Sequence, residues 1–362
     1  MKNTIGNSVA VTLFGESHGE YIGAVIDGLA PGIEIDHGYI SQMLLLRRPD
    51  GKISTPRKEN DELRIVSGVF NGKTTGTPIT ILIPNENVKS GDYAQMATVA
   101  RPSHADYTAQ CKYHGFQDYR GGGHFSGRIT AALVAAGAIC KYALEQKGIR
   151  IGTHVKRCAG ISDRAFSDLT ADIESVNQKT FAVLDEEKGE RMREAILAAA
   201  SEGDSVGGVL ETAIIGMPEG VGEPWFDTIE GMLSHMMFSI PAVKGIEFGA
   251  GFAISDMKGS EANDPFEMKD GRVVTATNNN GGINGGITNG MPIVFCTAVK
   301  PTPTIFKPQD SVDMISMTDA VLEGKGRHDP AIVHRARVVQ DAATAIVMCD
   351  ALAQRYGTDW LK

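Results

Sequence analysis

The side chains in this sequence that are best suited to chemistry are histidines that lie beside hydroxyl, cationic or carboxylate groups. Histidine titrates nearest to neutral pH, so such neighbours favour general acid–base catalysis. The groupings are Ser17-His18, His104-Ala105-Asp106 and Arg327-His328-Asp329. Each also has a structural interpretation, since a single histidine is more often structural and Asp329 before Pro330 is a good helix start. Three such groupings in one chain favour a functional site.

The histidines must be positioned by the segments around them, and the most informative segment is rich in glycine. It reads Asp118-Tyr119-Arg120-Gly121-Gly122-Gly123-His124-Phe125-Ser126-Gly127-Arg128. Three consecutive glycines occur where the chain turns tightly or approaches a ligand, because they lose much backbone entropy on folding. The apolar run at 129–144 predicts a helix with Ser126 as its N-cap, and a helix N-terminus attracts anions such as phosphate. The glycines alone would fit a capped core helix, but the adjoining His104, His124 and Arg128 favour a binding site.

Two further motifs could bind or transform an anion. Residues 15–19 match the G-x-S-x-G turn of serine hydrolases, but the strand expected at 21–27 stands where that turn needs a helix. A hydrolase that uses Ser17 is therefore a minor alternative to Ser17 and His18 donating hydrogen bonds to an anion. A proline-stiffened loop with a cation and two hydroxyls would suit a phosphate, although a plain strand exit is the structural alternative. This loop is Lys300-Pro301-Thr302-Pro303-Thr304.

Composition excludes several classes of protein. The chain has 362 residues and a net charge of −9, so we expect no nucleic-acid partner. The first residues form no signal peptide, and we expect no membrane span. The five cysteines are scattered and none has a metal-ligand spacing, which indicates free thiols in a cytoplasmic protein without a metal site. Walker A and Rossmann motifs are also missing, and a polyanionic small molecule with a phosphorylated cofactor fits best.

Hydrophobic periodicity predicts strands and helices in two similar halves. In the first half we expect strands at 9–14, 21–27, 63–70 and 79–83, a helix at 37–46 capped by Asp36, and the long helix after the glycines. In the second we expect strands at 149–158, at 214–215 and from 293, with helices at 227–238 and 331–355.

The two halves form a weak internal repeat. The turn at 25–32 resembles the turn at 214–220, and the strand after Gly76 resembles the strand after Gly290, although chance similarity is the alternative. A true repeat predicts an α+β sheet–helix–sheet sandwich with pseudo-two-fold symmetry, its long apolar helices between the sheets and its histidine loops at one end. We expect a single domain over 1–362, with 160–200 as an acidic, loop-rich surface segment that ends in a helix at 190–200.

Several long motifs, in the same order along almost the whole chain, resemble the chorismate synthase family. They are Gly15-Glu16-Ser17-His18-Gly19, Arg101-Pro102-Ser103-His104-Ala105-Asp106-Tyr107-Thr108, Asp118 to Gly123, Ser126-Gly127-Arg128, Ala242-Val243-Lys244-Gly245 and Gly326-Arg327-His328-Asp329-Pro330. The resemblance implies a lyase of the shikimate pathway of aromatic amino-acid biosynthesis. It would convert 5-enolpyruvylshikimate 3-phosphate to chorismate and phosphate by an anti-1,4-elimination. The reaction would require reduced FMN without net redox change, with NADPH or an external flavin reductase as the source of electrons. The family also implies a cytoplasmic homotetramer.

The resemblance also implies residue roles. His18 would protonate the departing phosphate, His104 would control protonation of the reduced flavin, and Asp329 would assist proton removal. Ser17 and Ser126 would support the histidine and the flavin. Flavin contacts would come from His124, Phe125, Ser126, Pro241, Ala242, Gly285, Lys300, Pro301, Thr302, Pro303, Thr304 and Arg327. Substrate anions would be bound by Arg47, Arg48, Lys52, Arg101 and Arg128.

The sequence departs from the family pattern near the flavin. His124 and Phe125 stand where an arginine and a serine are usual, so one cation and one hydroxyl are lost. Leu46 stands where the first of three arginines is usual, Lys52 replaces an arginine, and Asp341 replaces a glutamate. A flavin-binding protein that has lost the elimination is therefore an alternative to an active enzyme.

Overall fold

The computed structural model describes residues 2–49, 51–55, 61–86, 98–323 and 329–362, and it contains two large antiparallel sheets. The first sheet has the strand order β1 (Thr4–Ile5), β2 (Ala10–Gly15), β3 (Tyr21–Asp27), β7 (Ile79–Pro84), β4 (Arg64–Ser67). The second has the order β11 (Val243–Phe248), β16 (Ile293–Val299), β10 (Gly208–Ile215), β8 (Arg150–Cys158), β9 (Ile161–Ser162). All neighbouring strands are antiparallel.

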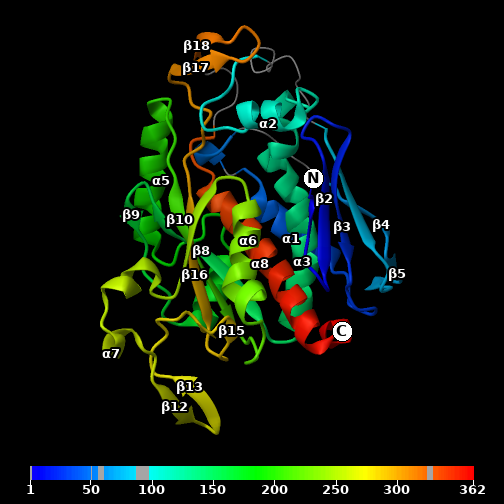
Figure 1. Ribbon diagram of the computed structural model, residues 1–362, viewed down its shortest axis with the longest axis vertical. Coiled ribbons are helices and arrows are strands. Elements are labelled where there is room, and N and C mark those ends of the chain that lie inside the picture. The colour runs from blue at the N-terminus through cyan, green and yellow to red at the C-terminus, as the bar shows by residue number, and fades with distance from the viewer. Residues whose placement is uncertain (1, 50, 56–60, 87–97, 324–328) are drawn as a thin grey trace.

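Helices fill the space between the two sheets (Figure 1). Helix α3 (Thr130–Gln146) packs on β3 and β7, and helix α8 (Val333–Tyr356) packs on β8 and β10. The two helices also pack on each other. They approach closely because a Cβ at Gly137 of α3 would clash with the backbone of Ala342 in α8. The α+β class is confirmed, and the layers run sheet, helices, sheet.

Two shorter helices flank this central pair, and the remaining elements are small. Helix α1 (His37–Arg47) packs on α3, and helix α6 (Ile229–Ser239) packs on α8 and β11. Asp36 caps α1 by accepting a hydrogen bond from the backbone N–H of Tyr39, as expected. The other elements are β5 (Val69–Phe70), β6 (Lys73–Thr74), α2 (Asp106–Tyr113), α4 (Leu169–Asn177), α5 (Glu186–Ser201), α7 (Gly259–Ala262), β12 (Phe266–Lys269), β13 (Arg272–Thr275), β14 (Ile283–Asn284), β15 (Ile287–Thr288), β17 (Gln309–Asp313), β18 (Thr318–Leu322) and short 3₁₀ turns.

The two halves of the chain place corresponding elements in the same order. The sheet order β2-β3-β7-β4 in the first half matches β8-β10-β16-β11 in the second. Helices α1 and α6 follow β3 and β10, and helices α3 and α8 follow β7 and β16. The pseudo-two-fold symmetry itself stays a prediction.

The apolar stretch Gly127–Gln146 has the length and composition of a membrane-spanning helix. In the folded protein, however, 83% of this window is buried against the sheet and α8, as in the core helix of a globular protein. All five cysteines are free thiols, as predicted. Within the described part of the chain, no group of three histidine, cysteine or acidic side chains is arranged to hold a metal ion.

The prediction that the segment 160–200 is rich in loops is wrong, but the helix predicted at 190–200 is confirmed as part of α5. The segment forms two helices, α4 and α5, and it buries apolar side chains against the second sheet. The buried side chains include Phe181, Val183, Met192 and Ile196, which pack with Val155 and Leu210. Apart from the buried Asp172, the charged residues of these helices are exposed or half-buried, and the high acidic content hid the apolar positions at helical spacing.

A buried histidine links this segment to the second sheet through hydrogen bonds. In β8, His154 lies 2.8 Å from Asp163 through Nδ1 and 3.0 Å from Glu211 through Nε2. Burial by itself lowers the pKa of His154, but the hydrogen bonds to Asp163 and Glu211 outweigh burial and raise the pKa above 6.5. Burial alone would raise the pKa of Glu211, but hydrogen bonds from His154 and Lys156 hold it down to about 2.

We expect this network to make stability depend on pH. The raised pKa means that the contribution of His154 is complete below about pH 6.5 and is lost as pH rises through the folded-state pKa. Replacing His154→Gln should cost about 3–5 kcal/mol at pH 6 and less at pH 9, as measured by urea unfolding. The exposed His235→Gln should show no such trend, and an equal cost for His154→Gln at both pH values would contradict the charged state of the histidine.

Candidate functional site

The predicted site is built around the turn of three glycines. Gly121, Gly122 and Gly123 all have positive φ, at 58°, 86° and 53°. A Cβ at Gly121 would clash with the ring of His18 and the hydroxyl of Ser17, and a Cβ at Gly122 would lie 3.2 Å from Cε1 of His104. The two histidines therefore lie against the same turn. They can approach its backbone this closely only because its residues are glycines, which have no side chain.

Ser17 and His18 are buried on one side of this turn. The hydroxyl of Ser17 lies 3.0 Å from Nδ1 of His18 and 3.1 and 3.2 Å from the carbonyl oxygens of Arg120 and Gly121. When this hydroxyl donates to a carbonyl, it accepts from the Nδ1–H of His18, which orients the imidazole ring. Ser17 is completely buried, which disfavours its use as a hydrolase nucleophile.

His104 lies against the turn next to an arginine–aspartate pair. Arg101 donates to both carboxylate oxygens of Asp106, over 2.8 and 2.7 Å, and Nδ1 of His104 lies 2.9 Å from the same carboxylate. Burial alone raises the pKa of Asp106, but the hydrogen bonds from Arg101 and His104 lower it well below its usual range. An ionised Asp106 fixes the orientation of the His104 ring by accepting from Nδ1–H.

The predicted substrate arginines Arg47, Arg48 and Arg128 converge on Asp61, which the sequence did not single out. Arg128 donates to Asp61, Arg47 lies 3.5 Å from it, and Arg48 lies 3.9 Å from it. The side chain of Asp61 is completely buried, and Arg47 is only 2% exposed. These three guanidinium groups lie near the His18 loop, because Asn85 donates to the Gly19 carbonyl of that loop and accepts from Arg128.

The predicted flavin-binding residues that lie near the histidines come from two parts of the chain. Ser126 caps the helix start, as predicted, by accepting from the N–H of Arg128, and Nδ1 of His124 donates to the Gly15 carbonyl. The side chain of Lys300 donates to the Ser103 carbonyl, and its backbone N–H donates to the Ala242 carbonyl. These bonds bring the loop 300–304 and residues 241–242 close to the segment that contains His104.

Some predicted residues lie elsewhere. Gly285 lies on the turn between β14 and β15, at the opposite end of the sandwich from α2 (Figure 1), so the structure does not bring it to this group. Asp329 pairs with Arg335 over 2.8 Å. Arg327 and His328 lie outside the described residues, and so does the side chain of Lys52.

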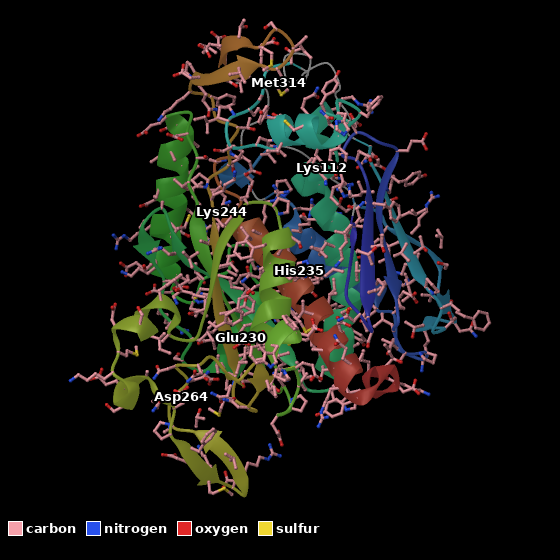
Figure 2. All side chains as sticks on the ribbon, in the orientation of Figure 1. Lys112, Glu230, His235, Lys244, Asp264 and Met314 are labelled. Atoms are coloured by element: carbon pink, nitrogen blue, oxygen red, sulfur yellow. The ribbon has the colours of Figure 1, made fainter. Side chains whose placement is uncertain are left out.

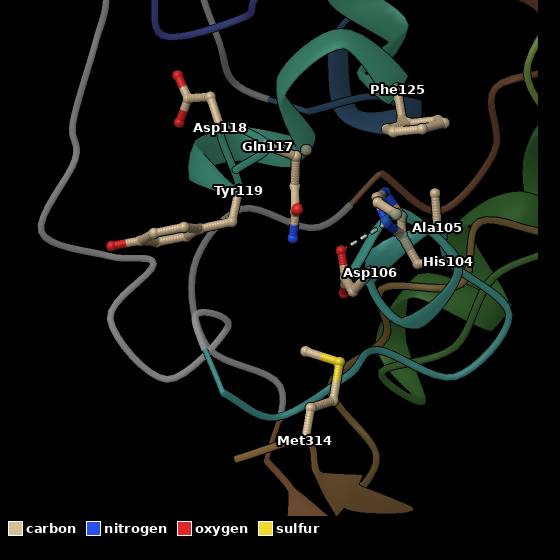
Figure 3. A pocket seen from close by; sticks show the side chains of 10 residues that line it. His104, Ala105, Asp106, Gln117, Asp118, Tyr119, Phe125 and Met314 are labelled. Carbon is tan, nitrogen blue, oxygen red and sulfur yellow. Dashed lines mark hydrogen bonds and ion pairs between the residues drawn. The ribbon is translucent and has the colours of Figure 1, made fainter. Parts of the chain in front are cut away.

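A pocket opens beside His104 (Figure 3) and encloses about 330 Å³ of empty space, part of it open to solvent. Its floor is formed by His104, Asp106 and Gly122, and an aromatic ring, Phe125, lies beside them. The other lining residues are Ala105, Ala109, Gln117, Asp118, Tyr119 and Met314. The mixture of aromatic, thioether and polar side chains suits a planar ring with a polar edge.

Comparison with known proteins identifies this combination of fold and site as that of an enzyme. The family model described as chorismate synthase matches residues 9–353. Chorismate synthase of Aeropyrum pernix is 46% identical over 355 residues, covering 98% of this chain and 93% of that protein. That of Dehalococcoides mccartyi is 45% identical over 360 residues, covering 99% and 98%. A crystal structure of chorismate synthase has a TM-score of 0.78 at 30% identity, covering 98% of this chain and 94% of that one. The chain belongs to the chorismate synthase family.

The glycine turn provides a direct test of the site geometry. Gly121→Ala should displace His18 and lower the rate of the enzyme about 100-fold, because a misplacement of about 1 Å has effects of that order. The matched control is Gly160→Ala, since Gly160 also has positive φ, at 80°, but a Cβ there meets nothing within 4 Å. Equal rates for the two folded variants would contradict the role of the turn.

Proposed function

We propose that this enzyme converts 5-enolpyruvylshikimate 3-phosphate to chorismate and phosphate by an anti-1,4-elimination that requires reduced FMN without net redox change. The observation that carries this proposal is the position of His18 and His104 on one glycine turn in a chain of the chorismate synthase family. The substrate has two carboxylates and a phosphate, so its recognition calls for cations such as the arginines that lie beside Asp61 and Asp106.

The residues around the pocket fit a flavin. The pocket has an aromatic wall at Phe125, and in the described part of the chain the buried hydroxyl of Thr302 has no hydrogen-bond partner. Phe125, Ser126, Ala242 and the 300–304 loop would hold the cofactor. When bound, reduced FMN supplies an electron to the substrate reversibly, which lets phosphate and hydrogen leave from distant carbons.

The proposed work of the protein is to place protons and exclude water. His18 delivers the proton on Nε2 to the departing phosphate, and Ser17 keeps that nitrogen oriented. His104 would exchange a proton beside the pocket, and the Arg101–Asp106 pair fixes its ring. Asp329 assists removal of the hydrogen as a proton, and Arg335 holds its carboxylate in place. Arg47, Arg48, Arg101 and Arg128, with Lys52, bind the anionic substrate groups.

The direct test is an anaerobic assay with reduced FMN and 5-enolpyruvylshikimate 3-phosphate. We expect equal amounts of chorismate and phosphate, and His104→Ala should lower the rate by about 100-fold or more. His235→Ala, at an exposed histidine of α6 (Figure 2), is the matched control and should leave the rate unchanged. FMN binding without product would favour the flavin-binding protein, and labelling of Ser17 by a fluorophosphonate probe would favour a serine hydrolase.

We also infer that the chain forms a single domain and that the protein is a cytoplasmic homotetramer. The electrons that reduce its flavin would come from NADPH or from an external flavin reductase. An apolar hairpin that projects from the body supports the assembly (Figure 1). Phe266 and Met268 of β12 lie on one face with Val273 of β13, and they are 67%, 72% and 60% exposed. Such a contiguous exposed apolar face is typical of a protein–protein contact.

The hairpin predicts an effect on assembly. Met268→Lys should weaken subunit contacts and shift the mass measured by light scattering towards smaller species, because it places a charge in an apolar contact. Glu267→Lys is the matched control, since Glu267 is the next residue and points to the opposite face of the strand. An unchanged mass for Met268→Lys would place the subunit contact elsewhere.

A further inference from the structure

The polar groups that line the pocket beside His104 are nearly all engaged within the protein. Both carboxylate oxygens of Asp106 accept from Arg101, and one of them also contacts His104. Both carboxylate oxygens of Asp118 accept from Arg120, over 2.9 and 2.8 Å. Both carboxylates therefore already accept hydrogen bonds from arginines, and they are poor candidates for accepting a hydrogen bond from the edge of a ligand ring.

Gln117 differs from these groups. Its Nε2 donates to Oε1 of Gln110 over 2.9 Å, which orients the amide. Its own Oε1 is buried and has no hydrogen-bond partner within the described part of the chain. Figure 3 shows the side chain extending into the pocket, between Tyr119 and Asp106. A buried carbonyl oxygen without a donor is unfavourable, so a ligand that fills this pocket is expected to bring an N–H or O–H to it.

The other walls define the kind of ligand that carries this donor. Phe125 is 38% exposed and makes an edge-to-face contact with Tyr113, so one face of its ring remains for stacking. Met314, Ala105 and Ala109 add apolar surface. Planar rings with apolar faces and one polar edge fit such a pocket.

We propose that Gln117 determines the specificity and orientation of the flavin ring by accepting a hydrogen bond from its imide N–H. This inference rests on the proposed flavin site. The oxidised ring has one N–H, at N3, and the two pocket carboxylates already accept from arginines. Gln117 is a positioning residue for the cofactor, and nothing in the catalytic proton transfers passes through it.

The experiment compares FMN with its N3-methyl derivative, which lacks the N–H, by titrating the full-length protein and following flavin fluorescence. The unmodified protein should bind FMN about 10-fold more tightly than the methyl derivative, the size of effect expected of one buried hydrogen bond. Gln117→Leu should lose about 10-fold in FMN affinity and no longer distinguish the two flavins. Gln117→Glu keeps an acceptor and should retain part of the discrimination.

The control is Gln354→Leu, at another buried amide, in α8. It should leave both affinities unchanged. A purely structural role for Gln117 would weaken both flavins equally, and that result, or persistent discrimination in Gln117→Leu, would overturn the proposal. Failure of the unmodified protein to bind FMN at all would instead refute the flavin site itself, and with it this role of Gln117.

Discussion

The candidate site of this protein depends on one turn that has no side chains. Three successive glycines with positive φ let the backbone pass between Ser17 and His18 on one side and His104 on the other. A side chain at Gly121 would occupy the space of the His18 ring, so the two titrating groups could not share this turn. Because Ser17 is hydrogen-bonded to the carbonyls of the same turn, the turn also orients His18. Backbone geometry here sets the distance between the groups that would handle protons.

The second constraint is electrostatic. The structure surrounds Asp61 with three arginines and pairs Asp106 with Arg101, so aspartates hold the cations in place before any ligand arrives. Mutual repulsion among neighbouring guanidinium groups would otherwise spread them apart, and the carboxylate offsets part of that repulsion. A polyanionic substrate would find these cations already oriented, which reduces the reorganisation that binding requires.

The loops of the candidate site are held by two sheets with helices packed between them. Helices α3 and α8 are apolar on several faces because each is covered by a sheet and by the other helix. Some polar residues in this interior are paired with one another, as in the bond from Thr153 to Asp341. The segment 160–200 belongs to this frame, since its buried side chains and the His154 network attach it to the second sheet. The site at one end is thus held by strands, helices and the turn that joins them.

The sequence by itself determined the elements whose signals are local. Asp36 and Ser126 begin helices as predicted, because a cap is decided by a side chain and the next few backbone N–H groups. His104 and Asp106 are close in the sequence and their side chains are in contact, in a turn that leads into α2. The glycine turn was recognisable because no other residue tolerates three positive φ values in succession.

Only the tertiary structure decided which distant groups meet. Asp61 became the partner of three arginines, Gln117 became an acceptor in the pocket, and Gly285 came to lie at the far end of the sandwich. The sequence around these residues carries no signal of those positions, because aspartate, glutamine and glycine are common in loops. Burial and long-range packing assign their roles, and these arise from how sheets and helices stack rather than from any local pattern.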